Sequence, residues 1–293
     1  MDISLALGGG GARGNAHVGV IRRFEQAGYR IRAVAGTSFG GIVAAMYAAG
    51  YSPDEIEKRF AALDQSKLYG HSSHDGPSIL GLAGATRALE EWLADRTFND
   101  LKLPCALVAV DIKNGREIIL KHGRVVDAIL ATVAVPGVFP PRLNGDHQLV
   151  DGGVLDPVPV TVARSLAPTL PVVAVVLTPM ARPGMAISQL PVPIPGPLLH
   201  RITNLRLTQA FDIFLKSVDI GNRMITELRL EVDDPEVVIR PAVSEIGLLD
   251  KVDIHQIVRL GEQAADDALD DLKRAVSWPN RLRRRLLPRP KAV

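Results

Sequence analysis

A serine stands between two glycines in the segment Gly36-Thr37-Ser38-Phe39-Gly40, which matches the pattern G-x-S-x-G. The segment follows a short apolar run and precedes apolar residues at helical spacing, so it predicts a sharp strand-to-helix turn. Such a turn exposes the serine hydroxyl near the positive end of the following helix, where it can act as a nucleophile. An ordinary glycine-rich turn is the alternative, and the flanking elements favour the nucleophile.

A serine nucleophile needs a base, and the chain offers two kinds of candidate. Asp151 ends a predicted strand, where parallel-sheet proteins place their chemistry, and Gly152 and Gly153 after it allow a tight turn. A plain Asp-Gly turn is the alternative for this motif. Among seven histidines, His255 comes in the right order for a catalytic triad, but we expect it to cap or pack a helix. His17 is expected to be structural.

Four consecutive glycines follow the first apolar run, in the stretch LALGGGGARG at residues 5–14. Such a loop suits a group that carries negative charge, and Gly9, Gly11 and Gly14 fit the dinucleotide pattern G-x-G-x-x-G. A dinucleotide fold also requires an acidic residue at the end of the second strand, and here that strand ends in Thr37-Ser38. We therefore expect this loop to bind no nucleotide.

The elements that must position these residues alternate along the chain. Apolar periodicity predicts strands at 3–8, 29–36, 104–112, 117–123, 148–153, 170–178 and 236–241, and helices at 14–28, 40–50, from Ser52 onward, 125–134, 201–231 and 253–276. The third and fourth strands are expected to pair across the Asn114-Gly115 turn. This order predicts an α/β fold, with a parallel sheet covered by helices on both faces.

Composition excludes several classes of protein. Of 293 residues, 47% are apolar and 23% charged, as in a globular protein, and no apolar run approaches the ~20 residues of a membrane span. The lone cysteine, Cys105, excludes an internal disulfide and a cysteine-based zinc site. The first residues lack the basic region of a signal peptide, so a cytoplasmic location is expected. Neither a metal nor a cofactor is expected.

Positive charge gathers at the end of the sequence. From Lys273 onward there are eight basic residues and no acid, and since the whole chain carries +2, residues 1–272 carry −6. Residues 277–293 interleave six cations with leucines and Trp278, which predicts either a solubilising tail or peripheral contact with an anionic inner-membrane surface. Nucleic acid is not expected, because no nucleic-acid-binding fold accompanies the tail. We therefore divide the chain into a domain at 1–276 and a tail at 277–293.

Three motifs in a fixed order resemble the patatin-like phospholipase family, above all its bacterial branch of neuropathy-target-esterase-like proteins. They are GGGARG (9–14), GTSFG (36–40) and DGG (151–153). The similarity extends over most of residues 3–178 and is weaker at 236–268. The resemblance implies a three-layer α/β/α fold with a mostly parallel central sheet, and a dyad of Ser38 as nucleophile and Asp151 as base. It implies an oxyanion hole at Gly9, Gly10 and Gly11, with motif support from Arg13, Gly14, Gly36, Gly40, Gly152 and Gly153.

The activity that this resemblance implies is hydrolysis of a phospholipid, lysophospholipid or other fatty-acyl ester. A soluble carboxylesterase acting on small or single-chain esters is one alternative, and a lipid-binding or regulatory scaffold with an idle dyad is another. Two segments are candidate lids: the glycine- and serine-rich stretch 66–86, expected to be a mobile loop, and the apolar, proline-rich stretch 187–200.

Overall fold

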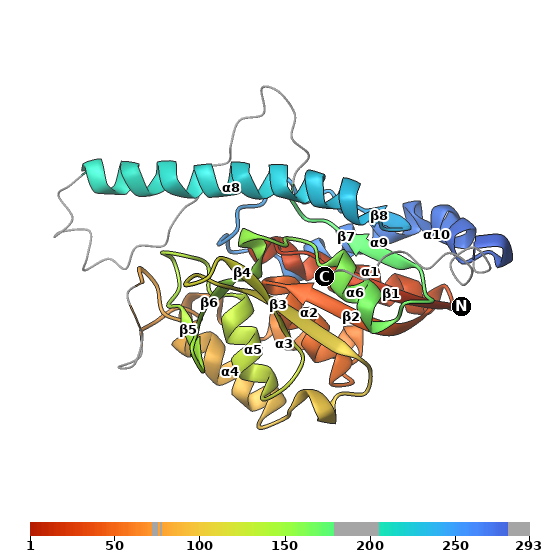
Figure 1. Cartoon of the computed structure of the whole chain (residues 1–293), viewed down its shortest axis with the longest axis horizontal. Helices are drawn as coiled ribbons and strands as arrows, with labels where there is room; N and C mark the ends of the chain where they lie inside the picture. Colours follow the sequence, from red (N-terminus) through yellow and green to blue (C-terminus); the bar gives the residue numbers. More distant parts are fainter. Residues whose placement is uncertain (72–75, 77, 179–204, 281–293) are drawn as a thin grey trace.

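A computed structural model of the chain describes residues 1–71, 76, 78–178 and 205–280; within 205–216 it gives the backbone and the side chain of Ile213. Its elements are β1 (Asp2–Leu7), α1 (Ala16–Gln26), β2 (Arg30–Thr37), α2 (Phe39–Ala48), α3 (Pro53–Ala61), α4 (Ala83–Leu93), β3 (Cys105–Asp111), β4 (Arg116–Leu120), α5 (Val125–Thr132), β5 (Arg142–Asn144), β6 (His147–Asp151), α6 (Val160–Leu166), β7 (Val172–Val175), α8 (Leu205–Asp233), β8 (Val237–Ile239), α9 (Ile254–Asp267) and α10 (Leu269–Ala275). The described helices lie on both sides of the sheet, in three layers (Figure 1).

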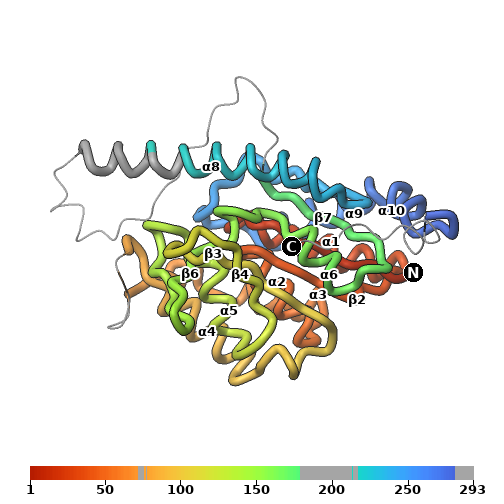
Figure 2. Tube along the Cα trace, viewed as in Figure 1, coloured from red at the N-terminus to blue at the C-terminus, as the bar shows by residue number. Residues whose placement is uncertain are grey.

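In the described part of the chain, eight strands form one sheet in the order β5-β6-β3-β2-β1-β7-β8, and β4 pairs with β3. The pairs β3–β2, β2–β1, β1–β7 and β7–β8 are parallel, which confirms a mostly parallel sheet. Strands distant in sequence therefore lie side by side, as β1 and β7 do (Figure 2).

The strand that carries Asp151 is antiparallel to its neighbour. The sequence predicts that residues 148–153 end at the carboxyl edge of a parallel sheet, but β6 is antiparallel to β3. Asp151 still reaches the right level, because it pairs with Ala109 while Thr37 of β2 pairs with Val108. Ser38 and Asp151 therefore flank β3 at almost the same height in the sheet.

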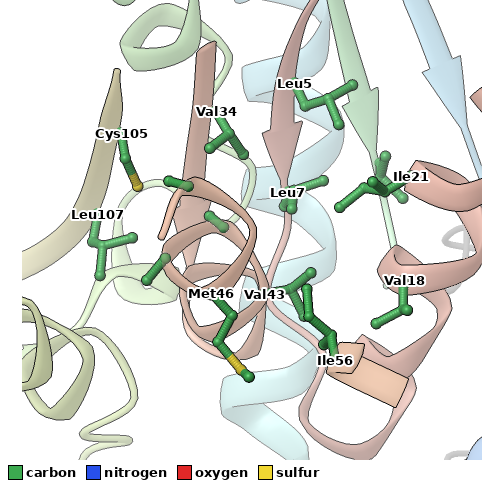
Figure 3. Packing of buried hydrophobic residues seen from close by; sticks show 14 of the residues in the cluster. Leu5, Leu7, Val18, Ile21, Val34, Val43, Met46, Ile56, Cys105 and Leu107 are labelled. Atoms are coloured by element: carbon green, nitrogen blue, oxygen red, sulfur yellow. The ribbon is translucent and has the colours of Figure 1, made fainter. Parts of the chain in front are cut away.

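The alternation of side chains along each strand gives the sheet two cores. Leu5, Leu7 and Leu107 point into the larger one, beneath α1, α2, α3, α5 and α9, and Figure 3 shows their packing. Ala6 and Ala35 point to the other face, where α6 and Leu230 of α8 cover them. Small residues on this second face let α6 pack close to the strands.

Several boundaries differ from the sequence-based expectation. The stretch 66–86 is not one loop, because Gly70 pairs with Leu82 and α4 begins at Ala83. The helices α4 and α6 were not expected, and the closing helix breaks at Ala268 into α9 and α10. The candidate lid 187–200 and residues 281–293 of the tail lie outside the described residues. Among the described helices, none has both the length and the hydropathy that crossing a bilayer requires.

Candidate active site

Ser38 occupies the turn between β2 and α2, as the G-x-S-x-G pattern predicts. Its backbone has φ 55° and ψ −128°, a left-handed conformation that non-glycine residues rarely adopt and that costs about 1–3 kcal/mol. Gly40 follows because the turn brings the helix against β1: a Cβ there would lie 2.2 Å from the Leu7 carbonyl oxygen. The turn therefore fixes a partly exposed serine hydroxyl at the start of a helix.

A buried threonine holds this strained turn in place. The Ser38 backbone N–H donates to Thr132 Oγ1 at 2.9 Å, and the Thr132 hydroxyl donates to the Val108 carbonyl oxygen at 2.5 Å. Thr132 ends α5 and is fully buried. It thus ties Ser38 to β3, and no motif in the sequence pointed to it.

Asp151 is buried beside this turn, with a side chain only 5% exposed. Its backbone N–H donates to the Ala134 carbonyl oxygen at 2.9 Å, and its Oδ1 accepts the Gly153 N–H at 2.8 Å. Burial raises the pKa of Asp151 from 3.8 to about 6, and the hydrogen bonds from the Ser38 hydroxyl and from Gly153 limit that rise. A carboxyl in contact with the Ser38 hydroxyl is thus both largely ionised at neutral pH and more basic than usual.

The glycine loop lies directly against Ser38 and is anchored on both sides. A Cβ on Gly9 would lie 3.2 Å from Ser38 Cβ. The Gly9 N–H donates to the Pro157 carbonyl oxygen at 3.0 Å, so it is not free for an oxyanion. Within the described part of the chain, the N–H groups of Gly10 and Gly11 have no hydrogen-bond partner. Of the three glycines predicted to form an oxyanion hole, Gly10 and Gly11 are therefore the two whose N–H groups have no partner among the described residues.

The rest of the loop packs on a segment far along the chain. Gly11 has φ 54°, and a Cβ on it would meet the Leu248 carbonyl oxygen at 2.1 Å, so only glycine fits there. The next residue, Ala12, donates its N–H to that same oxygen at 2.9 Å. Arg13 is 3% exposed and its Nε donates to the Ile246 carbonyl oxygen at 2.5 Å. Arg13 is therefore a buried anchor of the loop rather than a surface residue.

A second carboxyl lies beneath the turn, at Asp156. It is fully buried, it follows the Asp151-Gly-Gly motif, and its backbone carbonyl accepts the Thr37 hydroxyl at 2.9 Å. Burial raises the pKa of Asp156 to about 7, although Arg229 of α8 lies 3.0 Å from Oδ2. This pair joins α8 to the segment that carries Asp151, and the sequence alone gave no sign of it.

Neither singled-out histidine takes part in the cluster. His255 Nδ1 lies 2.5 Å from Glu57 Oε1 of α3, which does not support the triad. His17 is fully buried, its Nε2 bonds to the Gly8 carbonyl oxygen at 2.8 Å, and burial lowers its pKa to about 4. It is thus a neutral, structural histidine that holds the start of the glycine loop. In the described residues, no group of three or more His, Cys, Asp or Glu side chains could hold a metal ion.

Comparison with known proteins places the chain among its relatives. The family model described as patatin-like phospholipase matches residues 5–164, more than half of the chain. The chain belongs to the patatin-like phospholipase family. The match includes Gly9–Gly14, Ser38 and Asp151, and it agrees with the resemblance that the motifs indicate.

Two curated relatives come from Mycobacterium tuberculosis, and both are named as NTE family proteins. One is 35% identical over 159 residues, which cover 54% of this chain and 44% of the relative. The other is 30% identical over 273 residues, which cover 92% of this chain and 46% of the relative. The chain thus spans less than half the length of these relatives. The solved structure of VipD from Legionella pneumophila shares the fold, with a TM-score of 0.56 at 13% identity over 92% of this chain and 66% of VipD.

Proposed function

We propose that this chain is a serine hydrolase of lipid acyl esters, in which Ser38 is the nucleophile and Asp151 the base. The observation that carries the proposal is the strained Ser38 turn next to a buried carboxyl whose pKa is raised to about 6. Membership of the patatin-like phospholipase family supports the class of reaction.

In the acylation step, Ser38 Oγ forms a bond to the carbonyl carbon of the ester while its proton passes to Asp151. The carbonyl oxygen becomes an oxyanion, and the free N–H groups of Gly10 and Gly11 are the donors placed to stabilise it. The bond to the leaving alcohol then breaks, and Asp151 returns the proton to the leaving oxygen. The acyl group remains on Ser38.

Water completes the cycle by the same route. It attacks the acyl carbon and gives a proton to Asp151, and this proton returns to Ser38 Oγ as the fatty acid departs. A carboxylate is a weak base, so the raised pKa of Asp151 brings its basicity closer to neutral pH while leaving it mostly ionised. Thr132 keeps Ser38 in its strained conformation through both steps.

The family and the NTE relatives favour a fatty-acyl ester of a phospholipid or lysophospholipid as the substrate. A fluorophosphonate probe tests the proposal directly, since it labels an activated serine. We expect labelling of the wild type, none of Ser38→Ala, and almost none of Asp151→Asn, with all three folded by circular dichroism. Equal labelling of Ser38→Ala contradicts the proposal. Release of fatty acid from phosphatidylcholine and from a short-chain ester then separates a lipid hydrolase from a soluble esterase.

A further inference from the structure

The helix α8 turns charged side chains toward the protein beside Leu230, while most of its exposed side chains are aliphatic. It lies lengthwise along one side of the molecule, outside the sheet (Figure 1). A surface helix of a globular protein normally does the opposite, burying an apolar stripe and exposing polar groups. The reversal concerns the part of α8 whose side chains are described, namely Ile213 and residues 217–233.

The inner face of α8 is bound to the protein by charges and hydrogen bonds. Arg229 lies 3.0 Å from the buried carboxyl of Asp156, and Arg164 of α6 donates to the Asp233 carbonyl oxygen at 2.8 Å. Arg240, just after β8, donates to Glu227 of α8 at 2.9 Å, while Arg223 and Asp219 pair within the helix and are only 12% exposed. Asn222 Nδ2 lies 4.0 Å from where a Cβ on Gly153 would be, next to Asp151. These contacts fix which face of the helix points outward.

The outer face is mostly aliphatic. The exposed residues among the described side chains of α8 are Ile213, Ser217, Ile220, Met224, Leu228, Glu231 and Val232. Five of these seven form what we call the apolar stripe: Ile213, Ile220, Met224, Leu228 and Val232. Their exposure runs from 50% at Ile220 and Met224 to 80% at Val232. Four of them are spaced by four residues, so they lie along one side of the helix.

The size and charge of the apolar stripe indicate whether a second copy of the chain or a lipid surface covers it. Full burial of an aliphatic side chain corresponds to roughly 60–120 Å² of surface, so five side chains give on the order of 400 Å². A stable interface between two copies needs about 800 Å² from each partner, which the stripe does not supply. A lipid surface needs only an apolar face that enters the headgroup layer. Since Glu231 is the one charged group among the described outward side chains, attraction to anionic lipid contributes nothing there.

We propose that the apolar stripe of α8 docks this protein on the surface of a zwitterionic lipid bilayer. The choice of a lipid surface rests on the proposed function, while the stripe itself rests on the exposure of its side chains. In this orientation α8 lies between the bilayer and the segment that carries Asp151, so about one helix diameter, 10–12 Å, separates the two. This surface is different from the basic segment 277–293, where a contact with lipid would need an anionic surface and would weaken with salt.

The test measures binding separately from catalysis. Protein carrying Ser38→Ala is mixed with phosphatidylcholine vesicles and sedimented at low and at high salt, so that no substrate is consumed. In that background the double variant Met224→Gln/Leu228→Gln removes part of the stripe and keeps good helix formers. The matched control, Ile79→Gln/Leu143→Gln, removes two exposed aliphatic side chains on a loop and an edge strand. Analytical ultracentrifugation and thermal unfolding are recorded for each protein.

We expect binding that salt does not weaken, reduced roughly tenfold or more by the α8 double variant and left unchanged by the control. Equal binding by the α8 variant and its parent overturns the proposal. A dimer that the α8 variant converts to monomer, with unchanged vesicle binding, assigns the stripe to a second copy. A loss of thermal stability in the α8 variant alone, with unchanged vesicle binding, means that the stripe packs on this chain. Absence of hydrolysis by the wild type refutes the proposed function and leaves the docking result standing.

Discussion

Thr132→Val is expected to slow catalysis although Thr132 does not touch the reacting atoms. The substitution keeps the shape of the side chain and replaces the hydroxyl by a methyl group. It removes the acceptor of the Ser38 N–H, 2.9 Å away, and the donor to the Val108 carbonyl oxygen. The Thr132 side chain between them is fully buried, so water is not expected to replace the hydroxyl.

The magnitude follows from the bonds that are lost. Leaving a buried donor without a partner costs about 1–3 kcal/mol, and Ser38 already holds a conformation that costs about as much. If the turn relaxes, Ser38 must regain its conformation in the transition state. We therefore expect kcat to fall by about 5- to 100-fold, at 1.4 kcal/mol for each factor of ten, while KM changes little. The free energy of unfolding is expected to fall by about 1–3 kcal/mol.

Thr132→Ser is the control, because it retains the hydroxyl and loses the methyl group that packs against Gly41. Both variants are assayed for kcat and KM on a short-chain ester and for stability in urea. Thr132→Ser should lose stability and keep kcat within a few-fold of the wild type. A Thr132→Val variant with wild-type kcat, or equal losses of kcat in the two variants, refutes the positioning role.

The pH dependence of kcat/KM should show an apparent pKa near 6, with activity rising as Asp151 ionises and level above it; a profile that is flat between pH 5 and 8 contradicts this. Asp151→Asn should abolish hydrolysis yet raise the free energy of unfolding at neutral pH by about 1–3 kcal/mol. Because burial raises the pKa of Asp151, the ionised carboxylate destabilises the native state, and a neutral amide removes that cost. Denaturant titrations should show that this gain vanishes below pH 4. Gly10→Ala should reduce turnover by about 10² or more and also cost stability, because its Cβ would lie 2.8 Å from Leu177 Cβ. His255→Ala should leave turnover unchanged, as its partner is Glu57; a large loss in that assay revives the triad.

Local patterns were enough to predict the turn at Ser38. A buried strand, a G-x-S-x-G segment and apolar residues at helical spacing are contiguous in sequence, and the structure confirms the strand, turn and helix. The direction of β6 could not be predicted in the same way, since a short strand after Asn144 pairs in either direction and distant contacts decide. The alternation of β and α elements was nevertheless sufficient to predict a mostly parallel sheet.

The residues that sequence reasoning missed act over long distances along the chain. Thr132 is 94 residues from Ser38, and its hydroxyl is one of many. Arg13 was compatible with a surface position until the segment at Ile246 proved to cover it. The helix α8 was predicted from its periodicity, but the period does not say which face turns inward. Contacts with distant residues decide that, such as the pair between Arg229 and the buried carboxyl of Asp156.

The anchoring of the glycine loop has a consequence for how the protein is made. Arg13 and the carbonyl of Ile246 that accepts its hydrogen bond are 233 residues apart. At about 5–20 residues per second of synthesis, the ribosome adds Ile246 roughly 10–50 s after Arg13. Ser38 and Thr132 are both synthesised long before that, whereas the contacts that anchor Ala12 and Arg13 need the segment 246–248. The glycine loop therefore cannot be anchored until the segment around Leu248 has been added to the chain.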